Sequence, residues 1–181
     1  MSETGGIYND KQGPNANYVT YGEPLLAVAD GQVIAVKDGI VEYDTATGEI
    51  AVEGGRRTLA GNYVMLDIGD SVAAVYGHLQ PGSLNVSKGN RVKRGNVLGL
   101  LGDSSNSDLP HLDFHLETIT EQKSPISGDG ILFQFRTFDQ LAIYTVEEVG
   151  KAYAAGSADV NTHEDERVEE FPAKSGVLMF E

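Results

Sequence analysis

Glycines placed between short apolar runs are the feature of this sequence that most constrains its fold. The chain has 22 glycines in 181 residues, and several of them separate runs rich in Val, Ile and Leu. Short runs of this kind, bounded by Gly, Asp and Asn, are typical of β-strands joined by tight turns rather than of long helices. We therefore expect a mainly β fold, built from many short strands.

The centre of the chain carries the clearest hairpin pattern. The runs Tyr63–Ile68 and Val72–Tyr76 are separated only by Gly69–Ser71. Within the first run Val64, Leu66 and Ile68 alternate with the other residues, and alternate residues of a strand point to opposite faces of the sheet. This pattern predicts a β-hairpin with one buried face and one partly exposed face.

The rest of the chain gives further expectations and a division into parts. Residues 1–21 are expected to form a polar N-terminal arm, residues 22–122 a β domain, and residues 123–181 a C-terminal extension that packs on this domain. Further strands are expected at Pro24–Ala29, Gln32–Val36, within Arg91–Gly102, at His111–Ile119 and at Gly176–Phe180. Val41–Arg57 is interpreted as a long hairpin or loop, and Thr145–Ala154 as a short helix.

The charge of the chain excludes one class of partner. There are 13 Lys and Arg residues against 27 Asp and Glu residues, which gives a net charge of −14. A surface this acidic repels phosphate backbones at long range, so nucleic acid is not an expected partner. The acidic segment His163–Glu170 and the basic segment Lys88–Arg94 are both interpreted as solvated turns.

Other features of the composition limit where the chain works. No cysteine is present, so disulfides and Cys-based zinc sites are excluded. No run approaches the ~20 apolar residues that span a bilayer, and we expect no membrane insertion. The first residues contain no apolar stretch of the kind that a signal peptide needs, so the chain as written is not expected to be addressed for export.

Three of the four histidines fall in the β-rich part of the chain. These are His78, His111 and His115, whereas His163 lies in the acidic segment. His111, Asp113 and His115 are expected on one face of a single strand. Imidazole and carboxylate suit both zinc binding and acid–base catalysis, but a surface row of hydrogen-bonded side chains has the same pattern. Spacing alone does not separate these interpretations.

An ordered series of motifs between Gly22 and Glu117 bears on that choice. The series comprises Gly22–Pro24 before LLAVADGQVIAV, Gly61–Val64 leading to Tyr76–Leu79, the glycine-spaced run Lys88–Gly99, and Gly102–Ser107 followed by Pro110–Phe114. In this order the series resembles the lysostaphin/LytM-type zinc metallopeptidases, which are peptidoglycan endopeptidases. The resemblance implies their duplicated hybrid motif, an antiparallel β-sandwich or barrel-sandwich hybrid.

The resemblance also implies a chemistry and a location. In this family zinc is held by an upstream His-x-x-x-Asp pair and by the second His of a His-x-His motif. The His of the tyrosine motif and the first His of His-x-His lie beside the metal-bound water. The implied reaction is zinc-assisted hydrolysis of a peptide bond in peptidoglycan, and the implied location is extracytoplasmic.

Position by position, the motifs match only part of that site. His78 and His111 match the two catalytic histidines that do not bind metal, and Asp113 stands where the family has its zinc-binding His. His115, two residues further on, is a second candidate metal ligand. Zinc bound by this pair is expected to be weak or absent, because catalytic zinc normally has three protein ligands.

The upstream ligand pair has no counterpart in the sequence. No histidine precedes His78, and the positions at the family's ligand spacing are Gln12 and Ala16. We therefore expect a metallopeptidase-like domain with reduced or lost zinc hydrolase activity. Its groove is expected to keep the ability to bind a peptide, a glycan of peptidoglycan or a protein partner.

Two alternative functions stay open at this point. The first is an active metallohydrolase that has a non-standard ligand set or is completed by residues upstream of Met1. The second is a non-enzymatic carrier-type barrel-sandwich module, for which Val92–Leu98 supplies a half-motif but no exposed hairpin supplies the modified lysine. Phosphocarrier domains with a similar sandwich use two facing histidines, an arrangement that His78 and His111 could imitate.

Overall fold

Antiparallel strands make up nearly all of the regular structure. The computed structural model describes residues 14–43, 59–105, 107, 109–143, 165–170 and 176–179, and within them the one helical element is a 3-10 turn, η1 (Asn15–Asn17). The strands are β1 (Pro24–Leu26), β2 (Gly31–Lys37), β3 (Asn62–Gly69), β4 (Val72–Leu79), β5 (Arg91–Val92), β6 (Val97–Leu100), β7 (Asp113–Thr118), β8 (Gly130–Ile131), β9 (Phe135–Ile143), β10 (Asp165–Glu170) and β11 (Gly176–Met179). The predicted mainly β, antiparallel fold class is confirmed.

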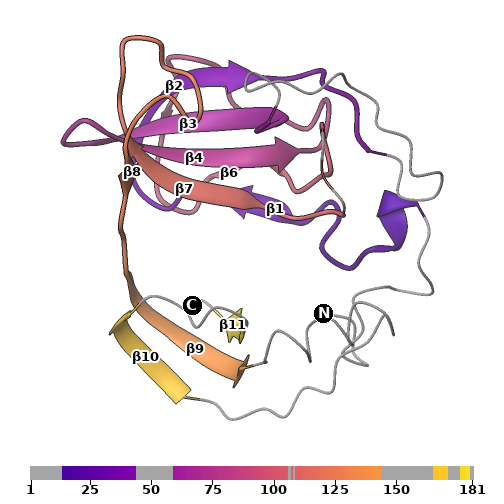
Figure 1. Ribbon diagram of the computed structural model, residues 1–181, viewed down its shortest axis with the longest axis vertical. Coiled ribbons are helices and arrows are strands. Elements are labelled where there is room, and N and C mark those ends of the chain that lie inside the picture. Colours follow the sequence, from indigo (N-terminus) through magenta and orange to yellow (C-terminus); the bar gives the residue numbers. More distant parts are fainter. Residues whose placement is uncertain are drawn as a thin grey trace. The chain divides into compact units, whose positions relative to one another are not determined.

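The chain forms two compact units. One comprises residues 13–131, and the other contains residues 132–181. The first unit holds a six-stranded sheet of order β5-β2-β3-β4-β7-β8 and a two-stranded sheet, β1-β6 (Figure 1). The second holds a three-stranded sheet of order β10-β9-β11. The packing of the C-terminal extension on the β domain stays a prediction.

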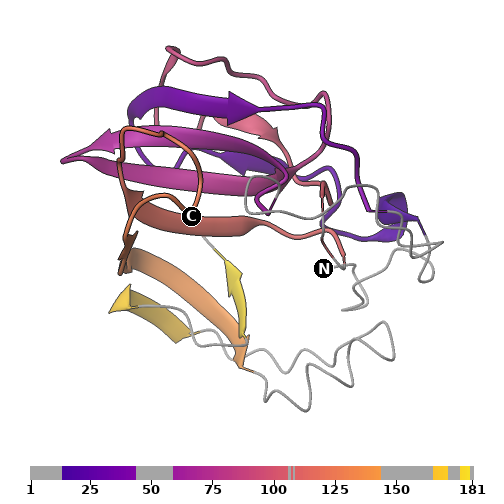
Figure 2. The same ribbon diagram turned by 45° about the horizontal axis from the view of Figure 1, so that its top comes forward.

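The main core of the first unit lies between its two sheets (Figure 2). Tyr76 is 1% exposed and makes an edge-on contact with Phe114, with 5.2 Å between the ring centroids. Its hydroxyl accepts a hydrogen bond of 2.8 Å from the backbone N–H of Val28. The core side chains come from both sheets: Leu25, Ala27, Val33, Val64, Leu66, Ala74, Tyr76, Leu79, Val92, Leu98 and Leu101.

The predicted central hairpin is confirmed as β3–β4. Its turn residues Asp70 and Ser71 have φ of 51° and 60°, the left-handed conformation that tight two-residue hairpin turns need. The prediction of one partly exposed face was wrong for Met65, which is 0% exposed. Met65 belongs to a second apolar cluster on the other face of the sheet, with Ile34, Ala73 and Val75.

Within the first unit, consecutive strands belong to different sheets at three places, between β1 and β2, between β5 and β6, and between β6 and β7. β1 pairs with β6, whereas β2 pairs with β3 and β5, so the Asp30-Gly31 connection joins different sheets. The Asp30 carboxylate fixes this corner by accepting hydrogen bonds from the Lys93 ammonium and the Arg94 N–H, at 2.6 and 2.9 Å. The strands predicted at Pro24–Ala29 and Gln32–Val36 are therefore confirmed as β1 and β2, which lie in different sheets.

Two sequence predictions about strands need correction. The strand predicted at His111–Ile119 begins at Asp113, so His111 precedes β7 and does not lie on its polar face. The predicted turn His163–Glu170 is wrong because Asp165–Glu170 forms β10, which pairs with β9. The residues numbered 44–58 and 144–164 lie outside the described residues, and so do nearly all of the predicted hairpin Val41–Arg57 and the predicted helix Thr145–Ala154.

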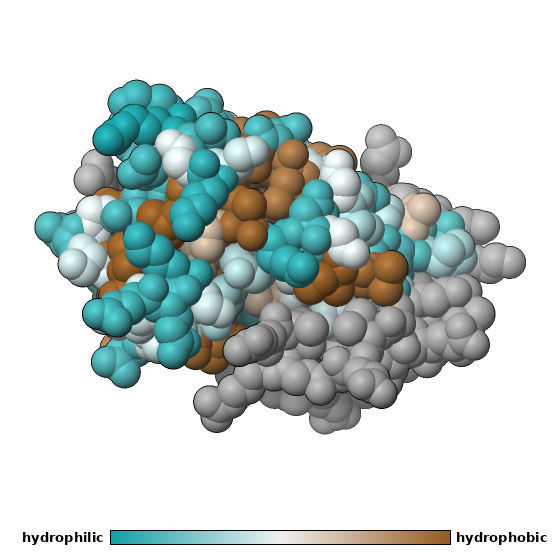
Figure 3. All heavy atoms as spheres, turned by 90° about the horizontal axis from the view of Figure 1, so that it is seen from above, coloured by the Kyte–Doolittle hydropathy of each residue, from teal (hydrophilic) through white to brown (hydrophobic). Residues whose placement is uncertain are grey.

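The surface of the first unit is mixed in character. In Figure 3 apolar side chains are exposed in several separate places on a largely hydrophilic face. The large apolar side chains that are most exposed in this unit are Leu26, Val28, Val41, Leu59, Val97 and Ile126. In the described part of the chain, no helix has the length and apolar character needed to cross a membrane.

Candidate functional site

His78 is held rigidly at the end of β4. Its φ of 60° lies in the left-handed region, and its side chain is only 5% exposed. Its Nδ1 lies 2.7 Å from the carbonyl oxygen of Ser104, and its backbone N–H donates to Ala60 O at 2.8 Å. Because a carbonyl only accepts, Nδ1 carries the hydrogen and Nε2 is left as an acceptor. Burial is the main cause that lowers the pKa of His78, which favours the neutral ring.

His111 faces His78 from the segment before β7. Its Nδ1 lies 2.8 Å from Leu109 O and 3.0 Å from the Ser107 hydroxyl. The carbonyl again requires the hydrogen on Nδ1, so Nε2 of this ring is an acceptor too. The two ring centroids are 4.7 Å apart, and the ring planes are tilted by 45°. The structure therefore brings the two predicted catalytic histidines together.

Asp113 lies beside this histidine pair at the start of β7. It is paired in register with Gly77 of β4, where a Cβ would lie only 3.2 Å from the Asp113 Cβ. Its negative charge acts on His78 and favours the protonated ring, but less than burial opposes it. None of the described residues forms a hydrogen bond or ion pair with the Asp113 carboxylate. Gly77 thus allows a half-buried carboxylate to approach the end of β4.

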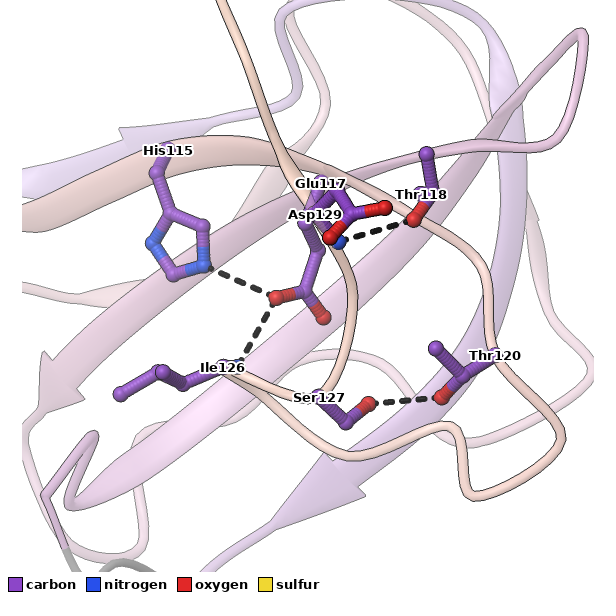
Figure 4. A network of polar contacts seen from close by, with 7 residues as sticks. All are labelled: His115, Glu117, Thr118, Thr120, Ile126, Ser127 and Asp129. Carbon is purple, nitrogen blue, oxygen red and sulfur yellow. Dashed lines mark hydrogen bonds and ion pairs between the residues drawn. The ribbon is translucent and has the colours of Figure 1, made fainter.

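His115 makes its own contacts further along β7. It is in register with Val75, whereas Asp113 is in register with Gly77. Its Nε2 lies 3.4 Å from Oε2 of the buried Glu117, as Figure 4 shows. The structure therefore places this candidate metal ligand in a polar network with Glu117 rather than against His78 and His111.

Sequence reasoning missed a buried polar loop that supports the pair. Asp103 is 0% exposed, and neither of its carboxylate oxygens accepts a well-formed hydrogen bond from a described residue. Burial is the main cause that raises its pKa to about 6, and the negative charge of Glu42 adds to this. The Ser107 hydroxyl, His111 and the Asn15 amide oppose the shift in part. The signal in the sequence is an acidic residue inside the small, polar run Gly102–Ser107.

Glu42 ties this loop to the N-terminal segment. One of its carboxylate oxygens accepts the Asp103 N–H at 3.1 Å, and the other accepts the Tyr21 hydroxyl at 2.6 Å. Burial, followed by the hydrogen bond to Glu42, raises the pKa of Tyr21 to about 12. These contacts join Tyr21 and Glu42 to the loop that carries Ser104 and Ser107, which in turn contact His78 and His111.

A catalytic zinc site requires a particular set of ligands. Such a site normally has three protein ligands, which are His nitrogens, carboxylate oxygens or thiolates. Among the described residues, no three His, Cys, Asp or Glu side chains lie close enough together to hold a metal ion. The Nδ1 atoms of His78 and His111 are also occupied by backbone carbonyls. The described residues therefore do not fit a zinc site of the usual kind.

The side chains of His78, His111 and Asp113 can accept hydrogen bonds. The pair presents two Nε2 acceptors, and Asp113 adds a carboxylate. Groups of this kind bind N–H and O–H donors of a peptide or sugar, and neutral imidazoles can also take up a proton. Hydrolysis would in addition require an activated water or nucleophile, which these side chains do not supply by themselves.

Comparison with known proteins places this arrangement in a family. Residues 16–126 match the model of "Peptidase family M23". The cell division protein DipM of Caulobacter vibrioides is 31% identical over 100 residues, a match that covers 54% of this chain and only 16% of that protein. The chain thus spans a small part of this relative.

Two catalytic domains of known structure are also similar to this chain. The catalytic domain of the prophage-encoded M23 protein EnpA from Enterococcus faecalis is 20% identical, with a TM-score of 0.43, and the match covers 68% of this chain and 82% of that chain. The catalytic domain of lysostaphin from Staphylococcus simulans is 19% identical, with a TM-score of 0.40 and coverage of 66% and 83%. Because the family model matches more than half of the residues, the chain belongs to peptidase family M23.

Proposed function

We propose that this domain is an M23 domain that has lost zinc hydrolase activity and retains a binding surface. Its ligand is proposed to be a peptide or glycan of peptidoglycan, or a protein partner associated with it. An extracytoplasmic location belongs to the same proposal, because peptidoglycan lies outside the cytoplasm.

One observation carries the proposal. The ring centroids of His78 and His111, which stand at the family's proton-handling positions, are 4.7 Å apart, but the described residues beside them do not complete a set of three metal ligands. Asp113 occupies the position of a zinc-binding His. Without a bound metal to lower its pKa, a water molecule is a poor nucleophile near neutral pH.

Retention of the surface follows from what holds it in place. The left-handed conformation of His78 costs about 1–2 kcal/mol and persists only where the surroundings determine it. Here Ala60, Gly102 and Ser104 hold the residue through backbone atoms. None of these contacts needs a metal ion, so the geometry of the site does not depend on zinc.

The experiment combines a binding assay with a lysis assay. Purified protein is pelleted with peptidoglycan sacculi, and the turbidity of the same suspension is followed with added zinc. We expect co-sedimentation without loss of turbidity. The paired substitution His78→Asn and His111→Asn is expected to weaken co-sedimentation. Zinc-dependent loss of turbidity that is abolished by His78→Asn would show an active enzyme and contradict the proposal.

A further inference from the structure

The face of β7 that carries Asp113 continues as a strip of polar side chains. Asp113, His115 and Glu117 alternate with apolar residues, so all three side chains lie on one face of the strand. One imidazole therefore stands between two carboxylates. Among the described residues, the only ion pair made by a Lys or Arg side chain is Lys93–Asp30, so none of the described Lys or Arg side chains pairs with this strip.

Glu117 is the buried anchor of the strip. Its side chain is 1% exposed, and its Oε2 accepts the backbone N–H of Ile126 at 2.9 Å while facing His115 Nε2 at 3.4 Å. Its other oxygen, Oε1, is buried and makes no hydrogen bond with any described residue. A buried carboxylate with so little compensation is costly, and it favours a cation nearby.

The carboxylate also sets which nitrogen of His115 faces the surface. With Nε2 directed at Glu117, this nitrogen carries the hydrogen, and Nδ1 is left as an acceptor. Figure 4 shows Nδ1 on the side of the ring away from Glu117. The His115 side chain is 30% exposed, and none of the described residues bonds to its Nδ1. Asp113, two residues earlier on the same face, supplies a second unbonded acceptor.

Ile126 adds an apolar element beside these acceptors. It is 51% exposed and has φ of 63°, a conformation that β-branched residues rarely adopt. The loop that imposes this conformation is closed by Thr120–Ser127 and Asp129–Thr118 hydrogen bonds of 2.7 and 2.9 Å. In Figure 4 the Ile126 side chain extends to the same side as His115 Nδ1.

We propose that this strip is a subsite for an aliphatic primary ammonium group, as on a lysine-type side chain of a peptide. The ammonium donates to the Asp113 carboxylate and to His115 Nδ1, and the methylene stem packs on Ile126. An ammonium has three donors and no acceptor, which matches a strip of acceptors without a cation. The proposal rests on the proposed binding function and names the chemistry that this surface selects.

The test uses the full-length protein and a matched pair of probes. The first probe is Nα-acetyl-lysine methylamide, and the second is the same compound with its ε-amine acetylated, which removes the charge but keeps the stem. Ring signals of His115 are followed by NMR. We expect a saturable shift with the amine, at a Kd of about 1 mM, and at least about tenfold weaker binding of the acetylated compound, as loss of a charge-assisted hydrogen bond predicts.

Three variants separate the parts of the subsite. Asp113→Asn is expected to weaken amine binding by about tenfold. Ile126→Asn removes the apolar contact, keeps a residue that tolerates positive φ, and is expected to weaken binding about threefold, near one buried methylene. Asp129→Asn removes an equal charge from the neighbouring exposed loop and is expected to leave binding unchanged.

Three outcomes would overturn the subsite. These are equal binding of both probes, no shift of His115 with the amine at about twenty times the expected Kd, or an equal effect of Asp129→Asn and Asp113→Asn. Each of these outcomes is read from NMR binding data and does not depend on zinc binding or on the turbidity assay. Failure of the subsite therefore leaves the lysis and sacculus assays to decide the proposed function separately.

Discussion

The imidazole rings of His78 and His111 lie 4.7 Å apart because antiparallel β4 and β7 pair Gly77 with Asp113. His78 is the second-last residue of β4, and His111 lies two residues before β7 begins. Each ring donates from Nδ1 to a backbone carbonyl, of Ser104 and Leu109 respectively. Main-chain contacts thus hold both rings of the pair.

Protonation of His78 should be unfavourable in the folded protein. Its pKa is lowered from the ordinary 6.5, chiefly by burial. A lowered folded pKa contributes stability above pH 6.5, and this contribution is lost as the pH falls through the folded pKa. We expect the free energy of unfolding to decrease as the pH is lowered from 6.5 through the folded pKa of His78. His78→Asn, which tolerates the positive φ, should remove that part of the decrease in urea titrations. An unchanged pH slope in the variant would contradict this account.

Ionisation of Asp103 should change the free energy of unfolding with the opposite dependence on pH. Its pKa is raised from 3.8 to about 6, so its contribution is present below pH 3.8 and is lost as the pH rises through about 6. A shift of about two units corresponds to roughly 3 kcal/mol at most. We expect Asp103→Asn to stabilise the protein by about 1–3 kcal/mol at pH 8 and to have little effect near pH 3.5. Urea unfolding at both pH values measures this. Asp70→Asn, in an exposed turn, is the control, and equal effects of both variants would refute the assignment.

Asn62 should be one of the most sensitive positions of the fold. It is 0% exposed, its Oδ1 accepts the Ile40 N–H, and its Nδ2 donates to Ile40 O and Leu79 O at 2.9 and 3.0 Å. Asn62→Ala leaves these backbone groups unpaired and should cost about 3–5 kcal/mol. Asn85→Ala, at an exposed position, should cost less than about 0.5 kcal/mol. Similar denaturation midpoints for the two variants would show that the Asn62 contacts contribute little.

Gly61 should be required for close packing and not only for backbone freedom. Its φ is +58°, and a Cβ there would lie 2.5 Å from the Ser104 hydroxyl. Gly82 also has positive φ, at +75°, but a Cβ there would meet nothing within 4 Å. We expect Gly82→Ala to cost about 1 kcal/mol, and Gly61→Ala at least about 3 kcal/mol, because it also displaces the Ser104 loop that holds His78. Equal unfolding free energies of the Gly61→Ala and Gly82→Ala variants would contradict a steric role for Gly61.

The sequence predicted the elements whose signals are local. The Gly69–Ser71 turn and the alternation in Tyr63–Ile68 defined the β3–β4 hairpin, because turn chemistry and side-chain period act over a few residues. The glycine-spaced motifs predicted the family for a related reason. Gly61, for example, lies where a side chain would collide with the Ser104 loop.

Features that depend on distant segments were not predictable in the same way. Met65 alternates like an exposed residue, but it packs with Ile34 and Val75 in a second cluster. His111 fits the strand pattern of its neighbours, but the hydrogen bonds of its Nδ1 to Leu109 and Ser107 hold it before β7 begins. The raised pKa of Asp103 comes from burial beside Glu42, about sixty residues earlier in the chain, and no local pattern reports that proximity.

Zinc titration of the purified, chelator-treated full chain by calorimetry tests the central claim most directly. We expect no stoichiometric binding tighter than about 1 µM, which corresponds to about −8 kcal/mol, and unchanged heats in His111→Asn. Asp113→His restores the family's ligand type and serves as a positive comparison, with expected tighter binding than the parent chain. One-to-one binding of zinc by the parent chain at sub-micromolar Kd, lost in His111→Asn or Asp113→Asn, would contradict the account.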